Sequence, residues 1–481
     1  MLFNSFEFLL FLPVVFLLYW FVFCSRKQQN MLLLIASYVF YGWWDWRFLF
    51  LILLTSACSY VSGIMMQQMI AFKHHICILN IIINVAILAL FKYFNFFIDN
   101  FELLFNSLGY HLDWPTLKII LPVGISFYTF QALSYTIDVY RDKIEPTKDI
   151  IAFFAYISFF PQLVAGPIER ATSLLPQFHK QRVFNYPQAV DGMRQMLWGF
   201  LKKLVIADNC AVVVNNYWFH YSELPGFALV VLCILFTIQI YCDFSGYSDI
   251  AIGCSRLFGF NLMRNFNNPY FAKSIQEHWQ RWHISLMSWF RDYVYIPMGG
   301  NRCSLWKRGR NIILVFLISG FWHGANWTYI VWGLYHALLI LICKFGIFNY
   351  LFLKLPINST NTILLRIKII SKIALTFSLV AFGFIIFRSE SVEQAFEFMS
   401  SLFTFSSGFF DTSMLQGRIY LCFGWIILFV EWIQRDKQHA LQFSQNGLFK
   451  YRLNRWLTYY FLLFVIVKYA GASQSFIYFQ F

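Results

Sequence analysis

The chain has 481 residues, of which 59% are hydrophobic and 12% are charged. A soluble globular domain usually carries about 25% charged residues, so the composition and the long apolar runs exclude that class. They predict an all-α, polytopic membrane protein. The net charge of +14 would suggest nucleic acid in a soluble protein, but here the basic residues lie between apolar runs, as membrane topology requires, and we expect no nucleic-acid partner.

Apolar runs of about 17 to 25 residues predict about a dozen membrane spans. The first run has no basic segment before it and no small-residue cleavage site after it, so we expect a retained helix rather than a signal peptide. Single cysteines without paired spacing favour buried thiols over a disulfide or metal site. The predicted spans lie near residues 6–23, 31–43, 47–66, 76–98, 117–139, 196–218, 226–242, 311–325, 326–345, 369–387, 417–433 and 456–471.

The basic connecting segments predict the orientation. Placing residues 24–30, with Arg26 and Lys27, on the cytoplasmic side puts the N-terminus outside. The acidic residues 99–114 then fall outside and residues 141–148 inside. With twelve spans, both termini are outside.

Residues 150–166 form an apolar run broken by Pro161 and followed by Pro167. Since basic segments flank it on both sides, we expect a hairpin that enters the membrane and returns to the cytoplasmic side. Protein or a cavity must then satisfy its backbone groups. The next segment, to residue 186, is amphipathic and basic and suits the membrane interface.

Polar residues follow the predicted span 226–242 in the sequence YCDFSGYSDIAIG. Asp243, Ser245 and Asp249 are candidate site residues, while Gly246 and Gly253 permit close backbone approach. The competing interpretation is that the Asp and Ser side chains cap the helix end and form a turn.

Two histidines stand out between residues 267 and 324. His283 lies in an aromatic and basic segment that cannot span a bilayer, and His323 ends an apolar run in SGFWHG. A buried imidazole stays neutral and can accept a proton, so both are candidates for a reaction centre. The competing interpretations are a packed ring that caps a helix end for His323, and an interfacial helix with its imidazole among the headgroups for His283.

The segment 256–310 is strongly basic. An anionic ligand with phosphates, such as coenzyme A, would suit it, since arginines hold phosphates bidentately. The competing interpretation is that this positive charge serves membrane topology and attraction to anionic lipid, with no bound ligand. Its basic residues are Arg256, Arg264, Lys273, Arg281, Arg291, Arg302, Lys307, Arg308 and Arg310, against Glu277 and Asp292.

Several motifs in this order closely resemble the membrane-bound O-acyltransferase family, over nearly the whole chain. They are LPVGISFYTFQALSYTIDVYR, FPQLVAGPIER, YCDFSGYSDIA, NNPYFAKSIQEHWQRWHISL, YIPMGGNR and SGFWHGANWTYIVWG. The resemblance is to the bacterial branch that O-acetylates exported polysaccharides such as alginate and peptidoglycan. It implies one integral membrane domain over residues 1–481 of a multi-pass protein of the bacterial cytoplasmic membrane, with N-terminal helices (1–145), a catalytic core (146–345) and C-terminal helices with a tail (346–481).

The resemblance implies tilted helices around a central funnel, with the family's essential histidine at His323 and its second, often polar, position at His283. His323 would act as the general base and His283 would position donor or acceptor. The donor would be acetyl-CoA or an acyl carrier thioester, with no bound cofactor and no metal. Candidate residues for binding substrate or donor are Arg281, Trp282, Trp322, Asn326, Asp243 and Ser245, Asn326 also as an oxyanion donor.

The C-terminal SQSFIYFQF would lie opposite the donor entrance, so Tyr478 is a candidate acyl relay. The competing role for Tyr478 is that of an interfacial anchor. No polar stretch is long enough to hold a polymer, so we expect an extracytoplasmic acetyltransferase partner, or direct docking of the polysaccharide. A lipid or protein acceptor and a transporter remain as alternatives, although no inverted repeat favours transport.

Overall fold

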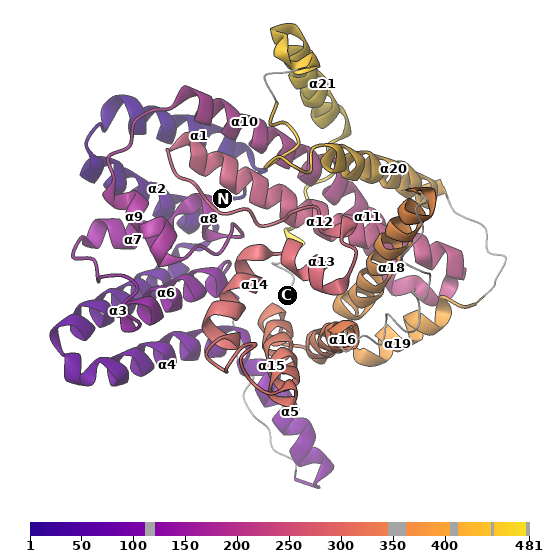
Figure 1. Cartoon of the computed structure of the whole chain (residues 1–481), viewed down its shortest axis with the longest axis horizontal. Coiled ribbons are helices and arrows are strands. Elements are labelled where there is room, and N and C mark those ends of the chain that lie inside the picture. The colour runs from indigo at the N-terminus through magenta and orange to yellow at the C-terminus, as the bar shows by residue number, and fades with distance from the viewer. Residues whose placement is uncertain (111–120, 345–361, 405–411, 444–446, 478–481) are drawn as a thin grey trace. The chain divides into compact units, whose positions relative to one another are not determined.

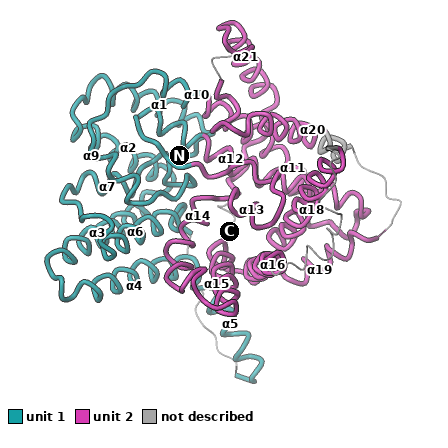
Figure 2. The backbone as a smooth tube through the Cα atoms, viewed as in Figure 1, with its two compact units in different colours: residues 1–193, 250–263 teal, residues 194–249, 264–481 magenta. Residues whose placement is uncertain are grey.

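The computed structural model describes residues 1–110, 121–344, 362–404, 412–443 and 447–477. Every regular element in these ranges is a helix (Figure 1), which confirms the predicted all-α class. The chain forms two compact units (Figure 2). One comprises residues 1–193 and 250–263, and the other comprises residues 194–249 and 264–481. The three-part division predicted from sequence stays a prediction.

Five stretches of the described chain are long and apolar enough to cross a membrane, and three shorter helices are apolar. A multi-pass membrane protein is therefore confirmed, while the count of about a dozen spans stays a prediction. The five stretches are Arg26–Gln68, Ile70–Lys92, Gly226–Leu257, Trp327–Lys344 and Ile363–Arg388, and the shorter helices are Phe6–Val22, Ile150–Leu163 and Ile419–Ile433.

The first unit is built around α6 (Ile125–Tyr140), which is buried along almost its whole length. Three of its polar side chains, Gln131, Ser134 and Thr136, donate to groups inside the unit, as when Gln131 Nε2 donates to Tyr156 O (2.7 Å). The helices α3 and α4 pack against α6. The other elements that begin in this unit are α1 (Phe6–Leu17), η1 (Leu18–Val22), α2 (Arg26–Asp45), η2 (Trp46–Phe48), α3 (Leu49–Gln68), η3 (Ile70–Phe72), α4 (Lys73–Lys92), α5 (Phe94–Ser107), α7 (Ile150–Ser158), α8 (Phe160–Leu163), α9 (Ala171–His179) and α10 (Tyr186–Phe200).

The predicted hairpin at residues 150–166 consists of α7 and α8. The chain breaks at Phe159, where ψ is 105°, and Pro161 follows in the first turn of α8, where the missing N–H costs no helical bond. Both helices are buried in the first unit, and the N–H of Phe160 donates to Ser37 Oγ (3.0 Å). Protein therefore satisfies this broken backbone, as the hairpin requires.

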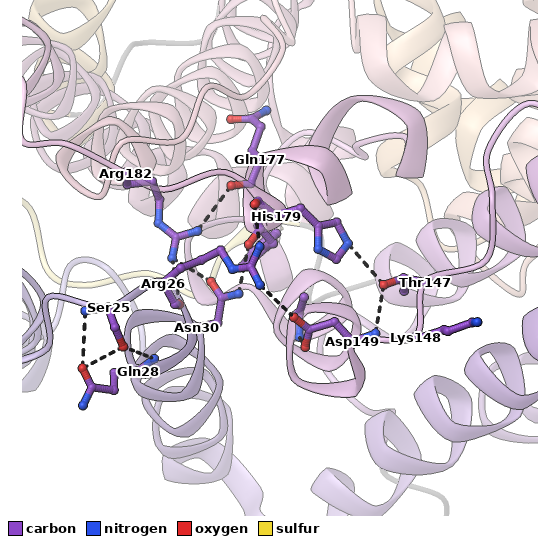
Figure 3. Close-up of polar contacts among 12 residues, drawn as sticks. Ser25, Arg26, Gln28, Asn30, Thr147, Lys148, Asp149, Gln177, His179 and Arg182 are labelled. Atoms are coloured by element: carbon purple, nitrogen blue, oxygen red, sulfur yellow. Dashed lines mark hydrogen bonds and ion pairs between the residues drawn. The ribbon is translucent and has the colours of Figure 1, made fainter.

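A polar network joins the start of α2 to α7 and α9 (Figure 3). Arg26 Nη1 donates to His179 O (2.9 Å), and the Arg26 guanidinium lies 4.0 Å from Asp149, which caps α7. Arg182 is buried and donates to Asn30 Oδ1 (2.7 Å). Residues 24–30 and 141–148 are predicted on the same membrane side, and this network is consistent with that.

The second unit holds most of the resemblance motifs. Its elements are η4 (Leu201–Ala207), α11 (Asp208–Tyr217), η5 (Trp218–Glu223), α12 (Gly226–Leu257), η6 (Pro269–Phe271), α13 (Ile275–Arg281), α14 (Ile284–Phe290), η7 (Arg291–Tyr295), α15 (Leu305–His323), α16 (Trp327–Lys344), α18 (Thr362–Arg388), α19 (Val392–Ser401), α20 (Thr412–Ile433), η8 (Leu448–Lys450) and α21 (Arg452–Tyr469). The last turns of α12, from Ile250, belong to the first unit.

α12 continues well past the predicted end of its span at residue 242. Asp243, Ser245 and Asp249 therefore lie inside a helix, and the interpretation as a helix-end cap and turn is wrong. The expectation of close backbone approach holds for Gly246, because a Cβ there would lie 2.9 Å from Gly199 O. Asp243 and Asp249 form ion pairs with lysines within the fold, rather than the turn that their polarity predicted.

Candidate functional site

His283 separates two short helices, α13 and α14. Its backbone is left-handed (φ 43°, ψ 52°), a conformation uncommon for residues other than glycine and tolerated better by histidine than by most. Two backbone bonds hold it there, from Ile284 N to Asn265 O and from Asn267 N to Arg281 O, both 2.9 Å. Strain of this kind persists where the surrounding structure determines it.

The His283 side chain is 1% exposed, so the interpretation as an interfacial imidazole among headgroups is wrong. Its Nδ1 lies 3.1 Å from Asn265 Oδ1. Asn265 in turn donates from Nδ2 to Ser248 Oγ on α12 (3.2 Å). Burial lowers the pKa of His283 to about 3, so the imidazole is neutral at physiological pH.

His323 is the last residue of α15 and is also buried. Its ring packs edge-on against Trp332 (5.1 Å between centroids) and Phe387 (5.4 Å). Trp322 contacts both histidines, with its ring centroid 4.9 Å from that of His323 and 6.1 Å from that of His283. One indole thus links the two imidazoles.

Glycines bring α15 against α16 and so set the position of His323. A Cβ on Gly320 would overlap the carbonyl oxygen of Tyr329, and one on Gly333 would overlap that of Phe316. Gly324, which ends α15, is covered by the Tyr329 ring. The glycines of SGFWHG therefore serve close helix packing, which places His323 against Trp332.

The candidate binding residues beside the histidines already have partners. Arg281 pairs with Glu277 (2.7 Å), and Trp282 is buried against His278, with centroids 5.6 Å apart. Asn326 caps α16 by accepting from Thr328 N (3.0 Å) and donates from Nδ2 to Glu390 O (2.8 Å). Their contacts to substrate stay predictions.

Asp243 lies on the same helix as Phe244, whose ring packs edge-on against His283 (4.6 Å). The Asp243 carboxylate pairs with Lys203 (2.7 Å) and accepts from Ile477 N (2.8 Å). The C-terminal segment is thereby held inside the second unit. Tyr478, the next residue, lies outside the described residues. Ser245 is buried on α12.

Two buried lysines are the basic partners of these acids, and neither was predicted from the sequence. Lys202 and Lys203 follow each other in the π-helix η4 and are both buried. Lys203 pairs with Asp208 (2.8 Å) and Asp243, while Lys202 pairs with Asp249 (2.7 Å) and with Glu431 of α20. They could have been found from the sequence, because both lysines fall inside the predicted span 196–218. An ionisable residue in a membrane span indicates a functional site or a buried ion pair.

The second unit also contains an apolar cavity of about 490 Å³ between α12, α18 and α20. Tyr270, Phe377 and Trp425 are among its lining residues, and neither candidate histidine is. Within the described residues, no group of three His, Cys, Asp or Glu side chains is arranged to hold a metal ion.

Comparison with known proteins identifies the class. The sequence profile of the membrane-bound O-acyltransferase family matches residues 144–380, which include both histidines. The chain is 39% identical over 411 residues to the "Probable alginate O-acetylase AlgI" of Pseudomonas aeruginosa, covering 85% of this chain and 76% of that protein. The chain belongs to the membrane-bound O-acyltransferase family. It is therefore a membrane acyltransferase, as the motifs indicated.

The chain is also similar to two further bacterial transferases. The peptidoglycan O-acetyltransferase of Helicobacter pylori is 34% identical over 434 residues, covering 84% of this chain and 80% of that protein. The teichoic acid D-alanyltransferase of Bacillus subtilis is 30% identical over 290 residues, covering 57% of this chain and 71% of that protein. The three relatives are named for alginate O-acetylation, peptidoglycan O-acetyl transfer and teichoic acid D-alanyl transfer.

Proposed function

We propose that this membrane-bound O-acyltransferase moves an acetyl group from cytoplasmic acetyl-CoA across the bacterial cytoplasmic membrane for O-acetylation of an exported polysaccharide of the alginate or peptidoglycan type. The names of the two relatives that each cover more than four fifths of this chain support the acetyl group and the polymer. The observation that carries the proposal is the pair of buried histidines that contact one indole, Trp322.

The chemistry assigns His323 as the general base. Its ring takes the proton of an acceptor hydroxyl as the oxygen attacks the thioester carbonyl. The carbon–sulfur bond then breaks, and the leaving thiolate receives a proton from the imidazolium. The aromatic rings of Trp322, Trp332 and Phe387 around His323 limit the access of water, which favours transfer over hydrolysis.

Tyr478 is the proposed first acceptor. Its phenol would receive the acetyl group and present the ester on the outer side, which divides one long transfer into two short ones. The anchoring of Ile477 by Asp243 supports a fixed tail next to this residue. An extracytoplasmic acetyltransferase or the polymer itself would then take the acetyl group.

The test uses purified protein in nanodiscs with acetyl-CoA labelled in the acetyl group. We expect wild type to release coenzyme A and to retain label on the chain. His323→Ala should lose both, and Tyr478→Phe should lose the retained label. His220→Ala is the matched control because His220 is an exposed histidine, with 64% of its side chain accessible.

Three results would overturn parts of the proposal. Wild-type coenzyme A release by folded His323→Ala would remove His323 as the base. Label from an acyl carrier thioester, with none from acetyl-CoA, would replace the donor. Label retained by Tyr478→Phe at the wild-type level would remove the relay and leave Tyr478 as an anchor.

A further inference from the structure

Asn265 is a buried side chain that no motif in the sequence singled out, and it lies at the centre of the hydrogen bonds around His283. One atom of its amide meets three groups. They are the N–H of Ser285 (3.3 Å), the hydroxyl of Ser285 (2.9 Å) and Nδ1 of His283 (3.1 Å). The other amide atom faces Ser248 Oγ.

The backbone N–H of Ser285 decides which amide atom is the oxygen. A backbone N–H can only donate, so the amide atom in front of it is Oδ1 rather than the NH₂ group. An amide oxygen can only accept. The Ser285 hydroxyl also lies 3.4 Å from Nδ1 of His283, but its shorter bond to Asn265 Oδ1 (2.9 Å) uses its one hydrogen. Nδ1 of His283 therefore carries a hydrogen toward Asn265 Oδ1, and Nε2 of the neutral ring carries the lone pair.

We infer that Asn265 is a positioning residue that fixes His283 in the Nδ1–H tautomer, so that Nε2 presents a lone pair to a hydrogen-bond donor of the substrate. This rests on the proposed acyl transfer and on the role of positioning donor or acceptor that the family resemblance implies for His283. It makes that role more specific, because a lone pair accepts a hydrogen bond and cannot donate one to the thioester oxygen. Since the hydrogen of the attacking hydroxyl goes to His323, the group bound at His283 is another N–H or O–H of the substrates. His283 therefore orients a substrate rather than stabilising the oxyanion.

Asp243, Asp249, Arg281 and His278, on the helices around His283, have partners other than the imidazole. On α12, Asp243 pairs with Lys203 and Asp249 pairs with Lys202. On α13, Arg281 pairs with Glu277, and His278 stacks on Trp282. His323 on α15 packs against Trp322, and the Tyr247 ring of α12 lies against Phe476.

Two substitutions at Asn265 separate orientation from simple packing. Asn265→Leu keeps the branched shape of the side chain and removes the accepting oxygen. We expect its rate of coenzyme A release to fall about 10- to 100-fold, by analogy with the loss of partners that orient metal-binding histidines. Asn265→Asp keeps an accepting oxygen, so it should recover much of the rate. Its negative charge favours imidazolium, so the acidic limb of its pH–rate profile should move up by about one pH unit or more.

Asn267→Leu is the matched control, because Asn267 bonds to Arg281 through its backbone N–H, which the substitution keeps. The tautomer itself is read without activity, from nitrogen chemical shifts of ¹⁵N-histidine-labelled protein, with His283→Gln used to assign the signal. We expect one Nδ1–H signal for His283 in wild type and in Asn265→Asp, and loss of the single tautomer in Asn265→Leu.

The outcomes distinguish this inference from the proposed function. A folded Asn265→Leu with the wild-type rate, while His283→Gln is inactive, would overturn the inference alone. A wild-type signal for Nε2–H would also overturn it. Full activity of His283→Gln would instead refute the proposed role of His283, whatever the tautomer.

Discussion

The two candidate histidines are buried in different chemical surroundings. His283 is held by an amide oxygen, whereas His323 packs among the aromatic rings of Trp322, Trp332 and Phe387. A hydrogen-bonded ring keeps one orientation, which suits binding, while a ring among aromatic side chains keeps a basic nitrogen in a dry setting. This difference supports separate roles as positioning residue and base.

Burial of His283 predicts acid sensitivity of the fold. Its folded pKa of about 3 lies below the unfolded value of about 6.5, so the unfolded state binds the proton first as the pH falls. Stability should therefore decrease between about pH 6.5 and pH 3, by up to about 1.4 kcal/mol per pH unit for each such histidine. His278, with a pKa lowered to about 4 by burial, acts in the same direction.

Thermal unfolding of detergent-solubilised protein between pH 7 and pH 4.5 measures this effect. The melting temperature of wild type should fall with pH, and that of His283→Gln should fall less steeply. Equal slopes for the two proteins would show that His283 is not neutral in the fold.

At the scale of elements, glycines and buried ion pairs hold the helices that carry the site. α15 contacts α16 closely at Gly320, where a Cβ would overlap the carbonyl oxygen of Tyr329. A Cβ on Gly309 in the same helix would instead lie 3.9 Å from the Leu341 side chain, an ordinary van der Waals contact. The two glycines therefore provide a matched pair.

Substituting alanine at these two positions should affect stability and activity differently. Gly320→Ala should separate α15 from α16, shift His323 from Trp332, and lower both the melting temperature and the rate of coenzyme A release. Gly309→Ala should be neutral or stabilising by up to about 1 kcal/mol, because alanine favours a helix interior. If Gly320→Ala melts and turns over like Gly309→Ala, the glycine contact does not position the site.

The C-terminal segment is tied to the second unit by several bonds. Gly471 N donates to Leu204 O (3.0 Å), Asn209 Nδ2 donates to Tyr469 O (2.8 Å), and Ile477 N donates to Asp243. Asp243 also neutralises Lys203. Ile477, the last residue that the structure describes, is thus bonded to a buried carboxylate.

Asp243→Ala should release this segment and leave Lys203 with Asp208 alone. Removing one partner of a buried pair destabilises by about 3 to 5 kcal/mol, so we expect a lower melting temperature and faster carboxypeptidase digestion of the tail. Glu223→Ala, at an exposed carboxylate, is the control. Digestion of Asp243→Ala at the wild-type rate would show that other contacts suffice to hold the tail.

For the whole molecule, composition and long apolar runs predicted the all-α membrane class, and the motifs predicted the family. The burial of His283 and His323 followed from the cost of exposing an ionisable group to lipid. The sequence did not reveal Asn265 or Glu431, because their partners lie far away in the chain and only the packed fold brings them together. The continuation of α12 beyond residue 242 was also not predicted, because the aspartates after that residue suggested a turn. In the fold, buried lysines pair with these aspartates inside the helix.

The most direct test is the ester-linked acetate content of the exported polymer in cells that lack this gene. Wild type and His220→Ala, expressed to equal levels in the membrane, should restore the acetate. His323→Ala should leave it at the level of the deletion. Restoration by His323→Ala to the wild-type level would contradict an acyl-transfer centre at this histidine.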